Sequence, residues 1–302
     1  MGSNPPPSGF LIQKHEVQPP EILPPEGWSP ADPPSAVQQE ELRAVRDRLP
    51  TNQPGPRSWA YAPATYLLVA INVAVFIAMV ISGVSFWDPT RDQLYQWGAT
   101  NPGAILYGGQ WIRVVTAMFV HVGIIHLASN MWCLWNLGLL GEPLIGPVGV
   151  LSAYVLSGAA GNLLSVGVAM ASHPDRANIA VGAGASGAVF GLAGVLIVLL
   201  KSPRLPIPPK ELSGLRRYVI YFALINFAIG FGGNRLNLGV NIDNMAHLGG
   251  FLGGILFALP MVPLLGSPRK LFYFRRRIAV GLMTAVLVFF GYFLSTVFWG
   301  PS

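Results

Sequence analysis

The 302-residue chain carries a formal net charge of +6, yet only 11% of its residues are charged and 52% are hydrophobic. Its apolar runs approach the roughly 20 residues that cross a bilayer, which indicates an integral membrane protein. The basic residues lie in loops between these runs, which argues against nucleic-acid binding. The single cysteine, Cys133, is predicted to be a packing residue, and it excludes an intramolecular disulfide framework.

The first 60 residues differ from the rest, because they are rich in proline and poor in apolar clusters. This composition predicts a flexible tail. Within the tail, residues 38–49 could form an amphipathic helix on the membrane surface, and a solvated helix fits the pattern equally well. The first apolar run begins only near Ala64, so we expect the first span to be its own insertion signal.

The remaining chain is predicted to form one helical domain with seven membrane spans. Their expected ranges are 64–85, 119–140, 147–170, 180–200, 216–232, 243–265 and 278–298. With the N-terminus inside, fifteen Lys and Arg residues fall on the inner side and four on the outer side. Because cytoplasmic loops carry an excess of Lys and Arg, this split predicts a cytoplasmic N-terminus and an external C-terminus.

Two reactive side chains lie inside apolar stretches, Ser186 in residues 181–191 and His247 in residues 244–254. Polar groups in a membrane are costly, and they often mark function. Gly182 and Gly184 favour loop conformations, so we expect the fourth helix to begin near Ser186 and to run 15 residues to Leu200. That helix is about 22 Å long against a core of about 30 Å, which leaves room for a water-filled pit.

Small residues predict that the fourth and sixth spans pack closely. They repeat every four positions, as Gly187 and Gly191 on the fourth span and as Ala246, Gly250 and Gly254 on the sixth. Such spacing lets helix backbones approach, which would bring the His247 imidazole against the Ser186 hydroxyl. The alternative is generic helix packing, with Ser186 merely capping its own helix.

Several motifs occur in a specific order along the chain. They are Trp111-Ile112-Arg113, then His121, His126 and Asn130 in HVGIIHLASN, then Gly184-Ala185-Ser186-Gly187, and finally Ala246-His247 with Gly250 and Gly254. Together they resemble the rhomboid family of intramembrane serine proteases, over about residues 60–265. In the first external loop, Trp111-Ile112-Arg113 resembles the family's tryptophan-arginine motif, here in the order Trp-x-Arg.

The resemblance implies a Ser-His dyad that needs no carboxylate. Ser186 would attack the scissile carbonyl, and His247 would take its proton and pass it to the leaving amine. His126 and Asn130, one helical turn apart, would stabilise the oxyanion. For Asn130 the alternative is a hydrogen bond between helices. His121 would be a support residue that points elsewhere on the helix, near the water boundary.

Two further residues bear on the His247 imidazole. Asp243 stands four positions before it and could complete a triad, but Asp at a helix start is a favoured N-cap and the family needs no acid. We therefore predict a cap. Phe190, one turn after Ser186, matches a position where relatives carry a tyrosine that stacks on the catalytic histidine. The phenylalanine keeps the stacking face without the hydroxyl.

The external loop of residues 84–118 is amphiphilic and aromatic, with Phe86, Trp87, Tyr95, Trp97, Tyr107 and Trp111. It resembles a loop that lies partly in the outer leaflet in this family. Most of these rings fit an interfacial aromatic belt. Trp111 and Arg113 fit the motif, and we expect them to be structural.

We therefore expect an all-α membrane protein with a rhomboid-like six-helix bundle and one C-terminal transmembrane helix. Residues 1–60 would be the cytoplasmic tail, 61–266 the catalytic core, and 267–302 a basic loop with the seventh span. The chain would cut transmembrane segments of membrane-anchored proteins that enter laterally from the lipid. No metal or organic cofactor is expected, because no motif such as HExxH occurs.

The predicted location is a bacterial cytoplasmic membrane, and the sequence does not indicate an oligomeric state. Two other classes of protein fit the sequence less well. A rhomboid-like pseudoenzyme that binds and escorts membrane proteins would typically lack the serine or the histidine. A transporter would be expected to show internal repeats, and none is evident.

Overall fold

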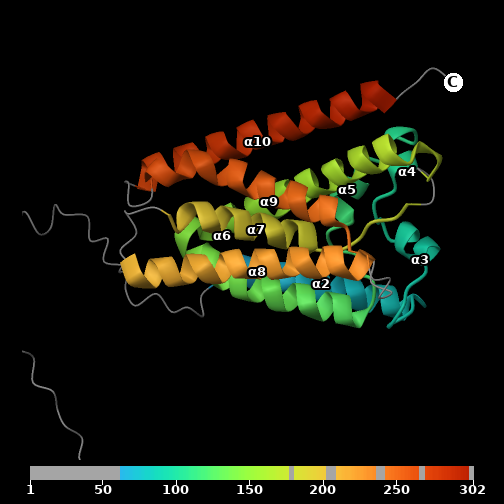
Figure 1. Cartoon of the computed structure of the whole chain (residues 1–302), viewed down its shortest axis with the longest axis horizontal. Coiled ribbons are helices and arrows are strands. Elements are labelled where there is room, and N and C mark those ends of the chain that lie inside the picture. The colour runs from blue at the N-terminus through green and yellow to red at the C-terminus, as the bar shows by residue number, and fades with distance from the viewer. Residues whose placement is uncertain (1–61, 177–179, 202–208, 236–241, 265–268, 299–302) are drawn as a thin grey trace, which may run out of the picture. The chain divides into compact units, whose positions relative to one another are not determined.

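Long apolar helices lie side by side in the described part of the chain (Figure 1). The structure is a computed structural model that describes residues 62–176, 180–201, 209–235, 242–264 and 269–298. Its α-helices are α2 (Pro63–Ile81), α3 (Arg91–Gln96), α4 (Pro102–Leu106), α5 (Arg113–Thr116), α6 (Ile124–Ser172), α7 (Ser186–Leu199), α8 (Pro209–Arg235), α9 (Asn244–Ala258) and α10 (Arg269–Phe298). The predicted tail, with its possible helix at residues 38–49, lies outside the described residues.

Five of these helices are long and apolar enough to cross a membrane, so the chain is a multi-pass integral membrane protein. Their spanning parts are Pro63–Ile81, Ile124–Ser172, Lys210–Ile229, Asn244–Val262 and Lys270–Phe298. Helix α6 is broken at Gly146, where the backbone has φ of +72°, so it contains two helical halves. These halves correspond to the second and third predicted spans. Helix α7 is apolar but has only 14 residues.

A buried carboxylate fixes the start of α2. The Glu142 side chain, on α6, accepts hydrogen bonds of 2.8 Å from the N–H groups of Ala64 and Thr65. It also accepts a bond of 2.7 Å from the Thr65 hydroxyl. The first N–H groups of a helix have no partner within it, so this acceptor satisfies donors that the membrane would leave unpaired. The Glu142 side chain of α6 therefore caps the start of α2.

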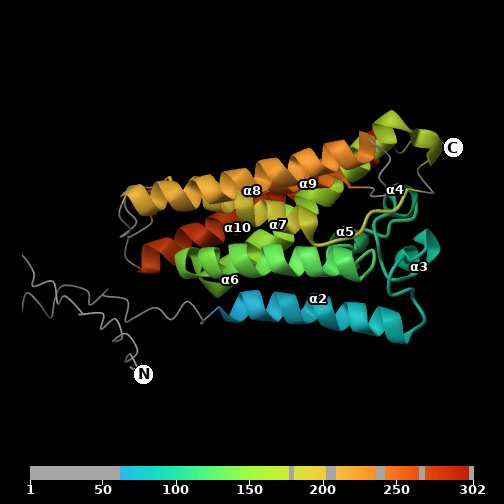
Figure 2. The same ribbon diagram turned by 60° about the horizontal axis from the view of Figure 1, so that its bottom comes forward.

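Helix α7 lies among α6, α8 and α9, and α10 packs outside them on α6 and α9 (Figures 1 and 2). The contact between α7 and α9 is made backbone to backbone. A Cβ added to Gly250 would overlap the carbonyl oxygen of Gly187, and one added to Gly254 would overlap that of Gly191. The predicted close approach of the fourth and sixth spans is confirmed, because only glycine leaves room for it.

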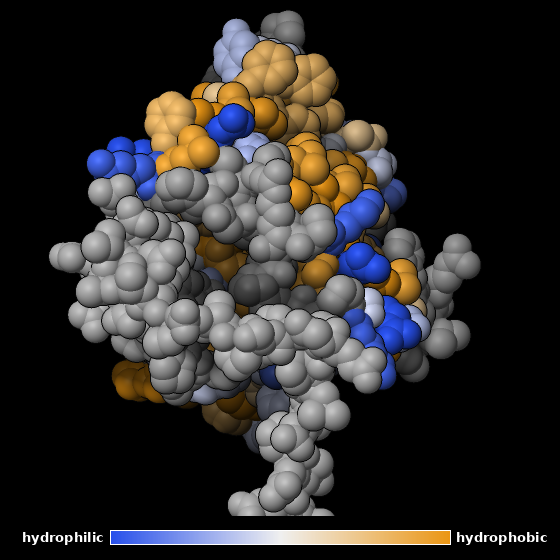
Figure 3. Space-filling view, turned by 90° about the vertical axis from the view of Figure 1, so that its left-hand side faces the viewer, coloured by the Kyte–Doolittle hydropathy of each residue, from blue (hydrophilic) through white to orange (hydrophobic). Residues whose placement is uncertain are grey.

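The short helices α3, α4 and α5 lie at the end of the bundle where α7 and α9 begin (Figure 2). Local capping forms them. Thr90 and Gln93 make a capping box for α3, and the Asn101 side chain caps α4. Figure 3 views the opposite end, where hydrophilic side chains interrupt the apolar surface. Exposed charged residues near the starts of α8 and α10 include Lys210, Arg217, Lys270, Arg275 and Arg277.

Candidate active site

The loop before α7 is held against an earlier segment of the chain. Thr100 N–H donates to the Gly182 carbonyl at 2.8 Å, and Gly182 N–H donates to the Thr100 carbonyl at 3.1 Å. Gly184, with φ of +133°, donates its N–H to the Ala117 carbonyl at 2.9 Å. Ser186 follows as the first residue of α7 and is half-buried. The predicted start of the fourth helix at Ser186 is therefore confirmed.

His121 contacts this loop directly. Its Nε2 accepts the Ala185 N–H at 3.4 Å, and its Nδ1 lies 3.3 Å from the Phe119 carbonyl oxygen. An Nε2 that accepts requires Nδ1 to carry the proton, so the two bonds select one neutral tautomer. The ring thus links residues 119–121 to the residue before Ser186.

One expectation about His121 was wrong. Helix α6 begins at Ile124 rather than at 119, because Gly123 has φ of +84° and ends the preceding loop. His121 therefore does not lie on the helix, and its side chain is fully buried.

His126 lies against Gly184, two residues before Ser186. Its Nδ1 accepts the Val122 N–H at 3.3 Å, so Nε2 carries the proton of the neutral ring and can donate it. A Cβ added to Gly184 would lie 2.6 Å from the His126 Cε1 and 3.0 Å from Nε2. Gly184 therefore makes room for the imidazole, and the donor is directed toward the loop that carries Ser186.

Asn130 follows His126 by one turn on α6 and is almost fully buried. Its side-chain amide donates to the His126 carbonyl at 2.9 Å. This bond lies within one helix, unlike the interhelical bond that was the alternative expectation. It uses one of the two amide hydrogens, so a second hydrogen is available to another acceptor.

The His247 imidazole stacks on Phe190 of α7. The ring centroids are 4.2 Å apart and the planes differ by 20°. Phe190 follows Ser186 by one turn, so both lie on the same side of α7. Phe227 of α8 makes edge-on contacts with both rings of this stack, with its centroid 6.1 Å from His247 and 4.7 Å from Phe190. The imidazole is thus held against the face of α7 that carries Ser186.

The His247 imidazole has a buried nitrogen without a hydrogen-bond partner. The imidazole is buried, with 6% of the residue exposed, and its Nδ1 is buried without a partner. Within the described residues no hydrogen bond joins the Ser186 hydroxyl to this ring. Catalytic hydrogen bonds are often long before substrate binds, so the arrangement is compatible with a dyad.

Asp243 caps α9, as predicted. Its Oδ1 accepts the Ala246 N–H at 2.9 Å, and its Oδ2 accepts the Ser165 hydroxyl at 2.5 Å. Both carboxylate oxygens therefore have partners other than His247. In a triad the His247 Nδ1–H would donate to the carboxylate, and that nitrogen has no partner.

Trp111 and Arg113 join the loop helices to the bundle. The Arg113 guanidinium donates to the carbonyls of Tyr95 at 2.7 Å and Ala99 at 3.0 Å, and lies 3.9 Å above the Tyr95 ring. A Cβ added to Gly291 of α10 would lie 3.3 Å from the Trp111 ring. Neither side chain contacts Ser186 or His247 in the contacts described, which agrees with a structural role.

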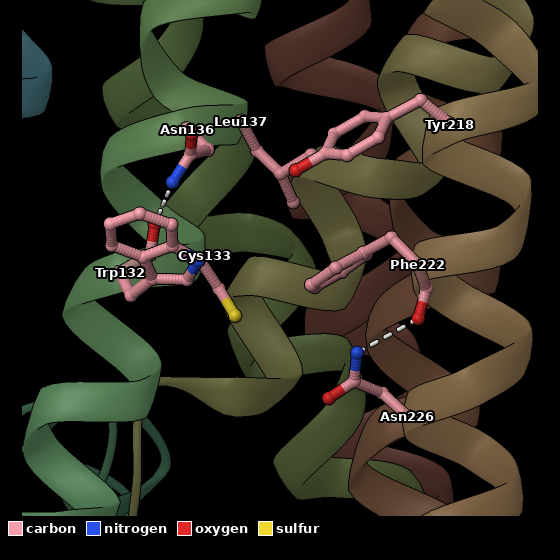
Figure 4. A pocket seen from close by; sticks show the side chains of 7 residues that line it. All are labelled: Trp132, Cys133, Asn136, Leu137, Tyr218, Phe222 and Asn226. Atoms are coloured by element: carbon pink, nitrogen blue, oxygen red, sulfur yellow. Dashed lines mark hydrogen bonds between the residues drawn. The ribbon is translucent and has the colours of Figure 1, made fainter.

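A pocket lies between α6 and α8, near the stacked rings of Phe190 and His247 (Figure 4). It has a volume of about 180 Å³ and is lined by Trp132, Cys133, Asn136, Leu137, Tyr218, Phe222 and Asn226. Phe222 also contacts Phe190, with centroids 6.1 Å apart, so one aromatic layer lies between the pocket and the His247 stack. Sequence reasoning missed these residues, although Asn136 and Asn226 within apolar helices were a signal.

Comparisons with known proteins identify relatives of this chain. A Rhomboid domain model matches residues 108–264. Rhomboid protease GluP of Bacillus subtilis is 31% identical over 229 residues, which are 76% of this chain and 40% of that protein. RHOMBOID-like protein 7 of Arabidopsis thaliana is 33% identical over 170 residues, 56% of this chain and 48% of that protein. Rhomboid protease AarA of Providencia stuartii is 29% identical over 210 residues, 66% of this chain and 72% of that protein.

The chain therefore matches less than half the length of the first two relatives. The matched family model covers both glycine-rich stretches, together with His121, His126 and Asn130.

Proposed function

The chain belongs to the rhomboid family, and we propose that it is an intramembrane serine endopeptidase that cleaves membrane-anchored proteins in or near their transmembrane segments. Two relatives of this chain are named rhomboid proteases. The multi-pass helical fold and the side chains at the start of α7 support the same activity.

In the proposed reaction Ser186 is the nucleophile and His247 is the general base. The Ser186 hydroxyl adds to the scissile carbonyl while its proton passes to the imidazole. The imidazolium then protonates the departing amine, and water hydrolyses the acyl-enzyme by the same route. Because Asp243 is engaged as a helix cap, we assign it no part in proton transfer.

The negative charge that develops on the substrate oxygen requires fixed donors. The first hydrogen bond within α7 runs from the Val189 N–H to the Ala185 carbonyl, so the Ser186 N–H precedes the helical ladder and is a suitable donor. His126 Nε2 lies against Gly184 and can supply a second donor. We include Asn130 as a third, through its remaining amide hydrogen.

The proposed architecture has seven spans, with the two halves of α6 and the short α7 each crossing part or all of the bilayer. The N-terminus is cytoplasmic, the C-terminus is external, and the membrane is a bacterial cytoplasmic membrane. The charged residues at the starts of α8 and α10 support this orientation (Figure 3). Residues 1–60, 61–266 and 267–302 remain the proposed tail, core and C-terminal helix.

We propose that substrate enters laterally between α6 and α8. The pocket in Figure 4 lies between these helices, and its Phe222 wall touches the Phe190 ring that stacks on His247. An extended substrate segment that displaced this aromatic layer would reach the dyad. Membrane lipid would occupy the same opening when substrate is absent.

A single observation carries the proposal. The His247 imidazole stacks on Phe190, one turn from Ser186, at a helix contact where glycine backbones touch. Generic helix packing explains the glycines, but it does not explain a buried imidazole whose Nδ1 has no partner.

The test is cleavage of a fluorescent single-span substrate by the purified chain in detergent. We expect Ser186→Ala and His247→Ala each to lower kcat at least about a thousandfold while both remain folded. Ser295→Ala, at a half-buried position, and His173→Ala, at an exposed one, are controls outside the proposed site, and they should cleave like wild type. Binding of the substrate without cleavage by the wild type would instead identify an escort protein.

A further inference from the structure

We propose that Tyr154 is a positioning residue for the active site, acting through the segment 117–121 on the loop before Ser186. This inference rests on the proposed function. Tyr154 lies in the second half of α6, and the proposed chemistry assigns it no role.

The Tyr154 hydroxyl makes two hydrogen bonds, one as donor and one as acceptor. It donates to the Met118 carbonyl at 3.3 Å and accepts a bond from the Asn72 amide at 3.2 Å. Its ring also packs on Phe119, with centroids 5.8 Å apart. The residue is fully buried. Tyr154 therefore fixes the carbonyl of Met118 and the ring of Phe119 at once.

The segment that Tyr154 fixes is the one that holds the loop. The Ala117 carbonyl accepts the Gly184 N–H at 2.9 Å. The Phe119 carbonyl orients His121, whose Nε2 accepts the Ala185 N–H at 3.4 Å. Gly184 and Ala185, the two residues before Ser186, are thus both bound to residues that flank Met118 within three positions. Movement of this segment would move the nucleophile and its neighbouring oxyanion donor.

Asn72 adds a reason to assign a polar role rather than packing. Its amide also donates to the Leu68 carbonyl at 2.8 Å, while its Oδ1 is buried without a partner. An unpaired acceptor in an apolar region is unfavourable, and a leucine would pack there without that cost. The Asn72 donor instead directs the hydroxyl so that its hydrogen faces the Met118 carbonyl.

The first test is Tyr154→Phe in the full chain, which removes one oxygen and keeps the ring. We expect kcat for the single-span substrate to fall about tenfold or more, because small displacements of reacting groups are costly, while KM stays unchanged. The rate at which a fluorophosphonate labels Ser186 should fall with kcat. Thr65→Val is the matched control, because it removes a buried hydroxyl bond at the start of α2, two turns before Asn72, and should leave kcat unchanged.

Asn72→Leu provides a second variant that keeps the hydroxyl and removes its donor, and we expect a smaller fall of about threefold in kcat. A double variant of Tyr154→Phe with His121→Ala should lose less kcat than the product of the two single losses, because both changes affect the bond between His121 and Ala185. Wild-type kcat in Tyr154→Phe, or fully additive losses in the double variant, would overturn the inference.

Hydrogen exchange separates this inference from the proposed function. Tyr154→Phe should speed exchange of the amides of Gly184 and Ala185, and Thr65→Val should not. If the wild type cleaves no substrate, the proposed function fails, and exchange still decides whether Tyr154 fixes the loop. Unchanged exchange in Tyr154→Phe would count against the inference whatever the activity.

Discussion

Replacing Gly250 by alanine tests whether the α7–α9 contact sets the geometry of the site. The new Cβ would overlap the carbonyl oxygen of Gly187 and lie 2.7 Å from its carbonyl carbon. Ordinary contact begins near 3.4 Å, so the carbonyl carbon alone requires a separation of about 0.7 Å, and the nearer carbonyl oxygen requires more. Because Gly187 adjoins Ser186 and Gly250 is one turn from His247, the separation would move the imidazole away from the hydroxyl.

The expected loss follows from that displacement. A misplacement of about 1 Å can cost about a hundredfold in rate, so we expect kcat of Gly250→Ala to fall between about tenfold and a hundredfold. Overpacking should also lower the free energy of unfolding by about 1–3 kcal/mol. The loss of rate should exceed what the unfolded fraction explains.

A graded series measured on the same substrate provides the controls. A Cβ on Gly187 would lie 3.2 Å from the Ala246 carbonyl oxygen, so Gly187→Ala should reduce kcat only a few-fold, as a small adjustment suffices. A Cβ on Gly281 meets nothing within 4 Å, so Gly281→Ala should match wild type. Cleavage by Gly250→Ala at the wild-type rate, in a protein as stable as Gly281→Ala, would refute the reasoning.

Two further predictions concern the surroundings of His247. Asp243→Asn should keep kcat within about threefold of wild type, because asparagine is as good an N-cap as aspartate and the carboxylate takes no part in proton transfer. Near-complete loss of cleavage, with the melting temperature preserved, would restore the triad. Phe190→Leu should lower kcat about threefold to tenfold, because an aromatic stack of about 0.5–1.5 kcal/mol no longer orients the imidazole, and Phe190→Tyr should keep the rate. Equal rates for the leucine and tyrosine variants would mean that the stack does not orient the ring.

Much of the fold could be predicted from local pattern. The apolar runs indicated the long helices of a membrane protein, and the two glycines before Ser186 predicted where α7 begins. Asp243 was recognised as a cap because its partner is the N–H of Ala246, three residues away. Helix ends were less certain, and the start of α6 was misplaced because Gly123 takes a positive φ that no periodicity reveals.

The sequence by itself determined which residues could react: a serine and a histidine on glycine-marked helices, in the order of a known family. Only the tertiary structure decided which distant residues make the hydrogen bonds that position these two side chains and their helices. His121 meets Ala185 across 64 positions, and Asn72 meets Tyr154 across 82. Glu142 caps α2 from 77 positions away. Capping and helix periodicity act within one turn and are written in adjacent residues, whereas these bonds exist only once packing brings distant helices together.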